Sequence, residues 1–301
     1  MNTVLNARTI DTVPVARIAC NVLGLFKLRI GFMIMVTALV GMAVTPGPAP
    51  GSFKVLVLAL AVLVASASAG AFNHYYERDS DRLMARTRGR PFVTGALPYS
   101  PWWLLLIAML LVVAVTAAAW VINPVSAGCV FLGAFFYGVV YTVWLKRRSS
   151  MNIVIGGLAG SFAVLAGATA ADASISAQPL LLAVVLFLWT PPHFWSLAIA
   201  NHEEYAAAGI PMLPVVVGRP RAARIVLWST IALSLTALLP GLFGAGVLYV
   251  AGALAGGGYF VAKAWLLARA PSRKTAMGAF FASLIQLSLL LVAATLDSLV
   301  R

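Results

Sequence analysis

Oxygen-bearing side chains recur at four-residue intervals in one short polar segment of an otherwise apolar chain. Asn73, Glu77 and Asp81 are spaced i, i+4 and i+8, so a continuing helix would place all three on one face. Like charges four residues apart repel by roughly a few tenths of a kcal/mol, so helix stability does not explain the pattern. Magnesium would offset the repulsion, because it binds one or two carboxylates and completes its shell with phosphate oxygens and water. The spacing therefore predicts that these three residues hold Mg²⁺.

Five arginines follow the acids directly, at positions 78, 82, 86, 88 and 90. Guanidinium groups match phosphate oxygens with paired hydrogen bonds, so carboxylates for a metal beside arginines for an anion indicate a diphosphate site. We take Arg86 and Arg90 as candidate catalytic residues, and Arg78 and Arg82 as candidate substrate ligands. The alternative is a solvated loop whose arginines pair with the acids and mark one side of a membrane.

A second region with chemical potential is the string Trp-Thr-Pro-Pro-His-Phe-Trp at 189–195, inside an apolar run. The two prolines remove helix hydrogen bonds, so we expect them to interrupt the helix. His193 lies about 10 Å from the nearer end of that run, and an ionisable residue within a membrane is a functional hypothesis by default. It could be an axial ligand or polar handle for a flat cofactor, or a neutral histidine bonded between helices. Trp189 could line a pocket or only pack.

Two more polar segments supply candidates. Glu204 and Tyr205 open a long polar loop, where Glu204 is a candidate metal contact and a solvated glutamate is the alternative. Lys146 and Arg147 follow another apolar run. We interpret them first as markers of membrane orientation and second as contacts for a diphosphate.

The elements that must position these residues are membrane helices. Of the 301 residues 62% are hydrophobic and only 10% are charged, whereas soluble domains have roughly a quarter charged. Runs of about 20 apolar residues suit a bilayer core, and nine are present. We therefore expect an all-α, polytopic membrane helical bundle with nine transmembrane helices. The expected spans are residues 28–46, 54–75, 101–122, 125–145, 152–171, 179–200, 223–241, 244–267 and 276–297.

Charge placement orients these spans. The net charge is +13, and the basic residues collect before the first span and after the second, fourth, sixth and eighth. The positive-inside rule then places the N-terminus in the cytoplasm and the C-terminus outside. We divide the chain into a cytoplasmic segment, 1–27, and a single transmembrane domain, 28–301. A nucleic-acid partner is not expected, because the basic charge is not gathered on one soluble face.

Together these segments resemble the protohaem farnesyltransferases (haem O synthases), a branch of the UbiA-type intramembrane prenyltransferases. The string at 189–195 separates this branch from relatives that prenylate quinone precursors. The resemblance runs from about Lys27 to Gly218, and the last three spans carry little motif. The matching positions are Asn73, Glu77, Arg78, Asp79, Asp81, Met84, Arg86, Thr87, Arg90 and Pro91; Tyr141, Thr142, 145–147, Asn152, Gly156, Gly157 and Gly160; and 189–195, Glu204, Tyr205 and 208–216.

The resemblance implies transfer of a farnesyl group from farnesyl diphosphate to a vinyl group of haem b, with water addition, giving haem O for terminal oxidases. It implies Mg²⁺ on Asn73, Glu77, Asp81 and Glu204, although both glutamates stand where many members have Asp. The implied substrate contacts also include Tyr141, Lys146, Arg147, Trp189, His193 and Tyr205. The implied setting is the lipid bilayer of a bacterial inner membrane, with active-site loops in the cytoplasm. Haem A synthase and terminal oxidase assembly factors are candidate partners.

Two other functions stay open from sequence. One is a prenyltransferase that acts on an aromatic quinone precursor, against which the segment around His193 argues. The other is a transporter or channel, which would also explain nine spans. Transporters usually place ionisable residues near the middle of the membrane, whereas the acids here cluster at one edge.

Overall fold

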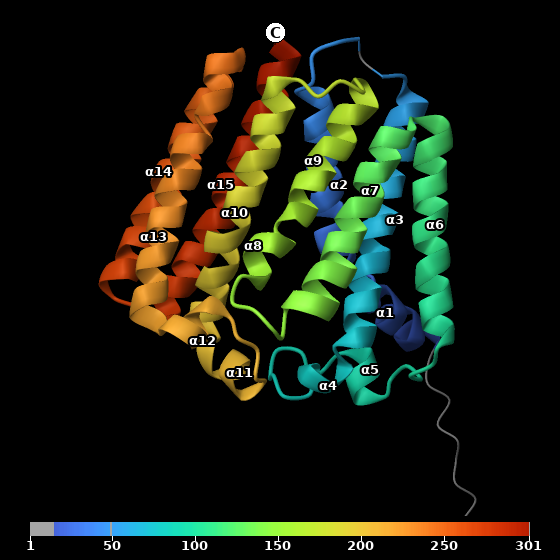
Figure 1. Ribbon diagram of the computed structural model, residues 1–301, viewed down its shortest axis with the longest axis vertical. Coiled ribbons are helices and arrows are strands. Elements are labelled where there is room, and N and C mark those ends of the chain that lie inside the picture. Colours follow the sequence, from blue (N-terminus) through green and yellow to red (C-terminus); the bar gives the residue numbers. More distant parts are fainter. Residues whose placement is uncertain (1–14, 49, 301) are drawn as a thin grey trace, which may run out of the picture.

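The computed structural model describes residues 15–48 and 50–300, and every regular element within those ranges is helical. Long helices stand side by side as a bundle, and several short helices collect at the end opposite the C-terminus (Figure 1). The all-α bundle predicted from the apolar runs is confirmed.

The helices alternate between long spans and short connecting pieces. The long elements are α2 (Leu28–Ala43), α3 (Ser52–Tyr76), α6 (Trp102–Val121), α7 (Pro124–Phe135) with its continuation η1 (Phe136–Leu145), α9 (Leu158–Ala171), α10 (Ala177–Ala200), α13 (Arg219–Thr236), α14 (Val247–Arg269) and α15 (Arg273–Val300). The short elements are α1 (Val15–Leu25), α4 (Arg78–Asp81), α5 (Pro91–Thr94), α8 (Asn152–Gly156), α11 (His202–Ala207), α12 (Leu213–Val217) and η2 (Leu239–Phe243).

The first expected span differs from the other eight. Eight spans in the described residues are long and apolar enough to cross a membrane, and the bent pair α1–α2 brings the number to nine. The 16 residues of α2 rise about 24 Å, less than the roughly 30 Å of a bilayer core. The chain bends by 41° between the two helices, where Lys27 adopts a left-handed φ of 46°. Helix α1 thus occupies the end of the expected segment 1–27, whose first fourteen residues lie outside the described ones.

The expected interruption of the sixth span is wrong, because α10 runs unbroken through Pro191 and Pro192. Proline cannot donate to the carbonyl four residues earlier, which frees those of Phe187 and Leu188. Both prolines are buried against neighbouring helices, and that packing holds the helix together.

Two helices on the N-terminal side meet backbone to backbone. A Cβ added to Gly167 of α9 would lie 1.7 Å from the carbonyl oxygen of Ala38 in α2. One added to Gly41 would lie 2.3 Å from that of Val164. Only glycine permits this approach, which is the usual way that membrane helices pack closely.

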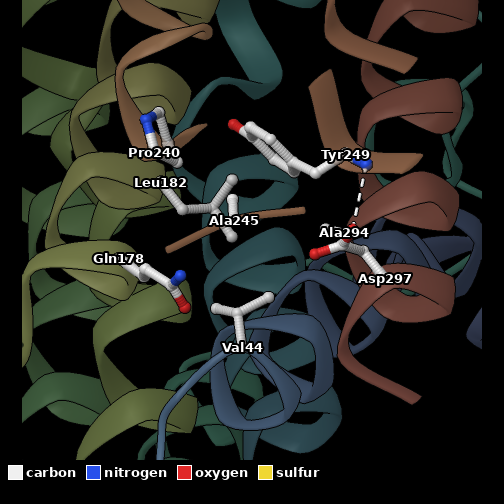
Figure 2. A pocket seen from close by; sticks show the side chains of 8 residues that line it. All are labelled: Val44, Gln178, Leu182, Pro240, Ala245, Tyr249, Ala294 and Asp297. Atoms are coloured by element: carbon white, nitrogen blue, oxygen red, sulfur yellow. Dashed lines mark hydrogen bonds between the residues drawn. The ribbon is translucent and has the colours of Figure 1, made fainter. Parts of the chain in front are cut away.

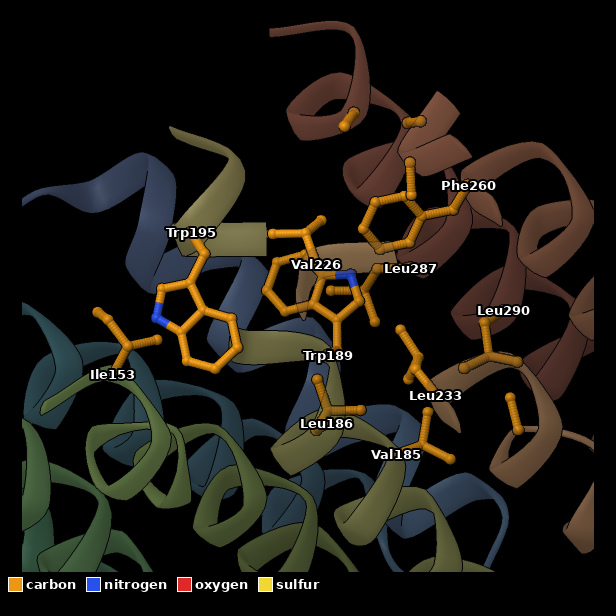
Figure 3. Packing of buried hydrophobic residues seen from close by; sticks show 14 of the residues in the cluster. Ile153, Val185, Leu186, Trp189, Trp195, Val226, Leu233, Phe260, Leu287 and Leu290 are labelled. Atoms are coloured by element: carbon orange, nitrogen blue, oxygen red, sulfur yellow. The ribbon is translucent and has the colours of Figure 1, made fainter. Parts of the chain in front are cut away.

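The largest apolar core joins α10 to α13, α14 and α15. Two tryptophans of α10 lie at different places in it (Figure 3). Trp195 lies beside Ile153 of α8, whereas Trp189 lies among Val226 and Leu287. Helix α10 therefore faces two parts of the bundle at once.

Candidate active site

The oxygen-bearing residues of the polar segment lie on one face of a helical turn. Helix α3 ends at Tyr76, but Glu77 N–H donates to the Asn73 carbonyl (3.0 Å) and Asp81 N–H to the Glu77 carbonyl (2.9 Å). These bonds carry the turn into α4 and stack the three side chains along one face. Asn73 and Glu77 are each 2% exposed and Asp81 is fully buried. We call these three residues the oxygen ladder.

Basic side chains of the protein itself already contact the oxygen ladder. Lys146 Nζ pairs with Glu77 Oε1, and Arg90 Nη1 lies 2.5 Å from Asp81 Oδ2 and 3.8 Å from Glu77 Oε2. Lys27 Nζ donates to Asn73 Oδ1 at 2.6 Å. Two cations thus pair with the two carboxylates, and they offset the repulsion that the sequence assigned to magnesium.

Burial disfavours the charged forms of the side chains at this site, whereas ion pairing favours them. Burial raises the pKa of the Asp81 carboxyl, while the Arg90 guanidinium acts to lower it. Burial also lowers the pKa of the Lys146 amine, which the Glu77 carboxylate opposes. Each charge therefore depends on its partner, as expected for largely buried ion pairs.

The π-helix η1 turns Tyr137 and Lys146 to the same side, toward the oxygen ladder. Element η1 has bonds of the i→i+5 type, such as Lys146 N–H to the Tyr141 carbonyl (2.9 Å). At about 100° per residue an α-helix would turn Lys146 about 180° away from Tyr137. At the roughly 4.4 residues per turn of a π-helix, the two point within about 20° of each other.

Two hydroxyl groups of η1 use this alignment. The Tyr137 hydroxyl accepts from Lys27 Nζ at 3.1 Å, and Thr142 Oγ1 accepts from Asn73 Nδ2 at 3.1 Å. Thr142 Oγ1 also donates to the Tyr137 carbonyl at 2.8 Å. Sequence reasoning missed Lys27 and Tyr137 as site residues and saw Thr142 only as part of a resemblance.

Some of the predicted substrate contacts line the rim of this site. Arg147 Nη2 donates to Ser80 Oγ (3.0 Å), and Arg86 Nη2 to the Tyr205 hydroxyl (3.4 Å). Burial raises the pKa of Tyr205, with Arg86 acting in the opposite direction. The ring of Tyr141 lies between η1 and α8, because a Cβ on Gly156 would come within 2.9 Å of it.

Other predicted residues lie apart from the oxygen ladder. Arg78 donates to Asp79 Oδ1 at 3.2 Å and stacks its guanidinium 4.0 Å from the Tyr99 ring centre. Arg82 is exposed. Neither arginine is thus aimed at Glu77 or Asp81.

The residues of the oxygen ladder suit a magnesium ion, and Glu204 forms no three-acid cluster with them. Asp81 Oδ1 is enclosed without a hydrogen-bond partner, and the Asn73 and Glu77 oxygens share its face. Such hard oxygen donors, with one or two carboxylates, are what Mg²⁺ takes before phosphate completes its shell. Within the described ranges no three histidine, cysteine or acidic side chains gather as a metal cluster. Glu204 does not form such a cluster with Glu77 and Asp81, although its Oε2 is buried without a hydrogen-bond partner, as Asp81 Oδ1 is.

His193 lies at the contact between α10 and α15. Its imidazole stacks on Trp189 with 4.1 Å between ring centres and on Phe280 with 4.6 Å. Its Nδ1 lies 2.6 Å from Ser283 Oγ, and Trp189 Nε1 donates to the Ser283 carbonyl at 2.9 Å. The sequence did not point to Ser283, which falls in a span without motif.

A small cavity lies at the opposite end of the bundle, among Val44, Gln178, Tyr249 and Asp297 (Figure 2). Its volume of about 10 Å³ suits one water molecule. The backbone N–H groups of Gly246 and Tyr249 donate to Asp297 there, which caps α14. This cavity is too small to hold a substrate.

Buried acids that face cations at one end of an apolar helical bundle are typical of a membrane protein with a functional site at the membrane edge. The chain belongs to the UbiA prenyltransferase family, whose family model matches residues 34–286. It is therefore a prenyltransferase.

Named relatives agree with this family. Protoheme IX farnesyltransferase 2 of Paramagnetospirillum magneticum is 57% identical over 274 residues, covering 91% of this chain and 95% of the relative. Protoheme IX farnesyltransferase 1 of Pseudomonas fluorescens is 42% identical over 277 residues, covering 91% and 92%. The resemblance read from the motifs is confirmed.

Solved structures agree on the fold. A structure from work on digeranylgeranylglyceryl phosphate synthase has a TM-score of 0.79 at 16% identity and covers 94% of this chain and 99% of its own. A UbiA homologue from Archaeoglobus fulgidus bound to DMAPP and Mg²⁺ has a TM-score of 0.69 at 16% identity, covering 90% and 99%. At such identity the likeness concerns the fold alone.

Proposed function

We propose that this protein transfers the farnesyl group of farnesyl diphosphate to a vinyl group of haem b, with water addition, and so forms haem O. The observation that carries the diphosphate half is the buried oxygen ladder faced by Lys27, Arg90 and Lys146. The haem half is supported by the name of relatives up to 57% identical over nearly the whole chain.

Asn73, Glu77 and Asp81 would hold Mg²⁺, which supplies positive charge to a departing diphosphate. Asp81 Oδ1 is buried without a hydrogen-bond partner, so no other group competes for it. Glu204 is left out of the proposed metal set, because it does not gather with these acids.

Arg90 and Lys146 serve the diphosphate in this proposal. Their guanidinium and ammonium groups face the place where the leaving oxygens gain charge as the C1–O bond of the farnesyl group breaks. The bonding electrons leave with the diphosphate, and C1 becomes an allylic cation. A haem vinyl carbon then bonds to C1, water adds to the resulting cation, and one proton is released. None of these reaction steps needs a covalent nucleophile from the protein.

We assign His193 to the binding site of the acceptor, haem b. We place the porphyrin or its iron against this imidazole, which lies on α10 about 10 Å before the helix reaches the polar end. Tyr141, Tyr205 and Trp189 are the proposed apolar and polar surroundings of the two substrates.

We also propose a setting for the reaction. Residues 28–301 would form one prenyltransferase domain in a bacterial inner membrane, with the oxygen ladder on the cytoplasmic side and the C-terminus outside. The N-terminal end of the bent pair α1–α2 would face the cytoplasm. Haem A synthase and terminal oxidase assembly factors are the proposed protein partners.

The test is the mass of haem extracted after the purified protein is incubated with haem b, farnesyl diphosphate and Mg²⁺. The expected result is a mass gain equal to one farnesyl group plus one hydroxyl group, because one proton of the added water is released. The same reaction with an aromatic quinone precursor in place of haem b is the control for acceptor identity. Prenylation of that precursor with unmodified haem b would overturn the proposal.

A further inference from the structure

A single hydrogen bond from α15 holds one edge of the His193 ring. Nδ1 lies 2.6 Å from Ser283 Oγ, and both residues are buried. Stacking on Trp189 and Phe280 fixes the plane of the ring, with interplanar angles of 18° and 28°. With both faces covered, only the edge of the imidazole is left for a ligand.

The direction of this hydrogen bond follows from a second contact of the same hydroxyl. Ser283 Oγ donates to the Phe280 carbonyl oxygen at 2.6 Å. A serine hydroxyl has one proton, so it cannot also donate to the imidazole. His193 Nδ1 must therefore carry a proton and donate it to Ser283 Oγ. In a neutral ring Nε2 is then left with its lone pair.

The structure leaves that lone pair available. His193 Nε2 makes no hydrogen bond to any residue that the structure describes. Unlike His74 Nδ1, it is also not fully enclosed by protein atoms. A neutral imidazole with a bonded Nδ1–H and a free Nε2 is the arrangement that histidine ligands of metals adopt.

We propose that Ser283 is a positioning residue, which fixes His193 in the Nδ1–H tautomer so that Nε2 offers its lone pair to the iron of haem b. This inference rests on the proposed function for the identity of the ligand. It assigns a role to a span that carries no recognisable motif. The role depends on the hydroxyl alone, because Trp189 bonds to the backbone carbonyl of Ser283, which any substitution keeps.

The first experiment reads the tautomer without haem. The protein with ¹⁵N-labelled histidine is placed in lipid nanodiscs, and the ring nitrogen shifts of its three histidines are recorded. His74→Gln and His202→Gln spectra assign the His193 signals. We expect a pure Nδ1–H tautomer in the wild type, a mixture in Ser283→Ala and recovery in Ser283→Thr. An unchanged tautomer in Ser283→Ala overturns the proposal.

The second experiment adds ferric haem b and follows its visible spectrum. We expect the wild type to give the spectrum of a nitrogen-ligated haem, His193→Ala to lose it, and Ser283→Ala to bind haem about tenfold more weakly. Ser161→Ala is the matched control, because Ser161 is also buried and donates to a helix carbonyl, that of Ala183 at 2.8 Å. We expect wild-type haem binding in this control.

The two experiments separate this inference from the proposed function. A tautomer that changes while the haem spectrum and affinity stay the same in Ser283→Ala overturns the role of Nε2 as an iron ligand. Expected results in both experiments support the inference even in a protein that transfers no farnesyl group. Such a protein would contradict the proposed function alone.

Discussion

At the scale of single residues, the site is a set of buried charges that depend on one another. Asp81 is fully buried, and Arg90 contacts it at 2.5 Å. Removing one member of such a pair typically costs about 3–5 kcal/mol of stability, because the remaining charge has no partner. A variant must therefore be tested for folding as well as for activity.

We expect Asp81→Asn to lower farnesyl transfer by about 10²–10³-fold while the protein stays folded, because a ligand for the metal and a partner of Arg90 are lost together. Product formation at saturating Mg²⁺ and thermal unfolding in detergent are the measurements. Asp79→Asn is the matched control, since Asp79 is exposed and pairs with Arg78. Near-normal product from Asp81→Asn would remove this residue from the site.

The sequence predicted some of these residues and not others. The spacing of Asn73, Glu77 and Asp81 placed them on one face, because i, i+4 periodicity is a local property. Lys27 was named as the start of the resemblance and not as a site residue, and its bond to Asn73 joins residues 46 positions apart. No local pattern carries information about such a contact.

At the scale of helices, two features escaped prediction. The apolar run at 125–145 has the composition of any membrane helix, and nothing in it distinguishes i→i+4 from i→i+5 bonding. At Pro191 and Pro192 the local rule predicted a break, but tertiary packing kept α10 continuous. The sequence thus predicted that these helices exist, but not the hydrogen-bond type of η1 or the continuity of α10.

We expect Thr142→Val to weaken the join between η1 and the oxygen ladder, because the variant loses the hydroxyl that accepts from Asn73 and donates to Tyr137. The loss of about 1 kcal/mol per bond should lower thermal stability and raise the KM for farnesyl diphosphate several-fold. Thr142→Ser should restore both quantities. Equal KM values for the valine and serine variants would contradict this role.

At the scale of the molecule, composition gave the number of spans, and the bent pair α1–α2 is needed to reach nine. Nine spans would place Val15 and Val300, the first and last described residues, on opposite sides of the membrane. The arrangement agrees with Figure 1, where α1 lies at the end of the bundle away from the C-terminus.

We expect alkaline phosphatase fused after Arg301 to be active in cells, because that enzyme needs the oxidising space outside the inner membrane. Fusion after Ala270, which removes α15, should leave it inactive, and green fluorescent protein should show the reverse pattern. Activity of the fusion after Ala270 and not after Arg301 would invert the proposed orientation.

The cations on the oxygen ladder also bear on the order in which ligands arrive. Glu77 and Asp81 are already neutralised by Lys146 and Arg90, so binding of free Mg²⁺ would leave those cations buried without partners. A diphosphate that arrives with the metal provides new oxygens for both cations. We therefore expect calorimetry to detect weak binding of Mg²⁺ alone and at least tenfold tighter binding once a non-hydrolysable diphosphate is present. Under the proposed function, the true substrate of this enzyme is then the magnesium salt of the prenyl donor, and rates should follow the concentration of that complex.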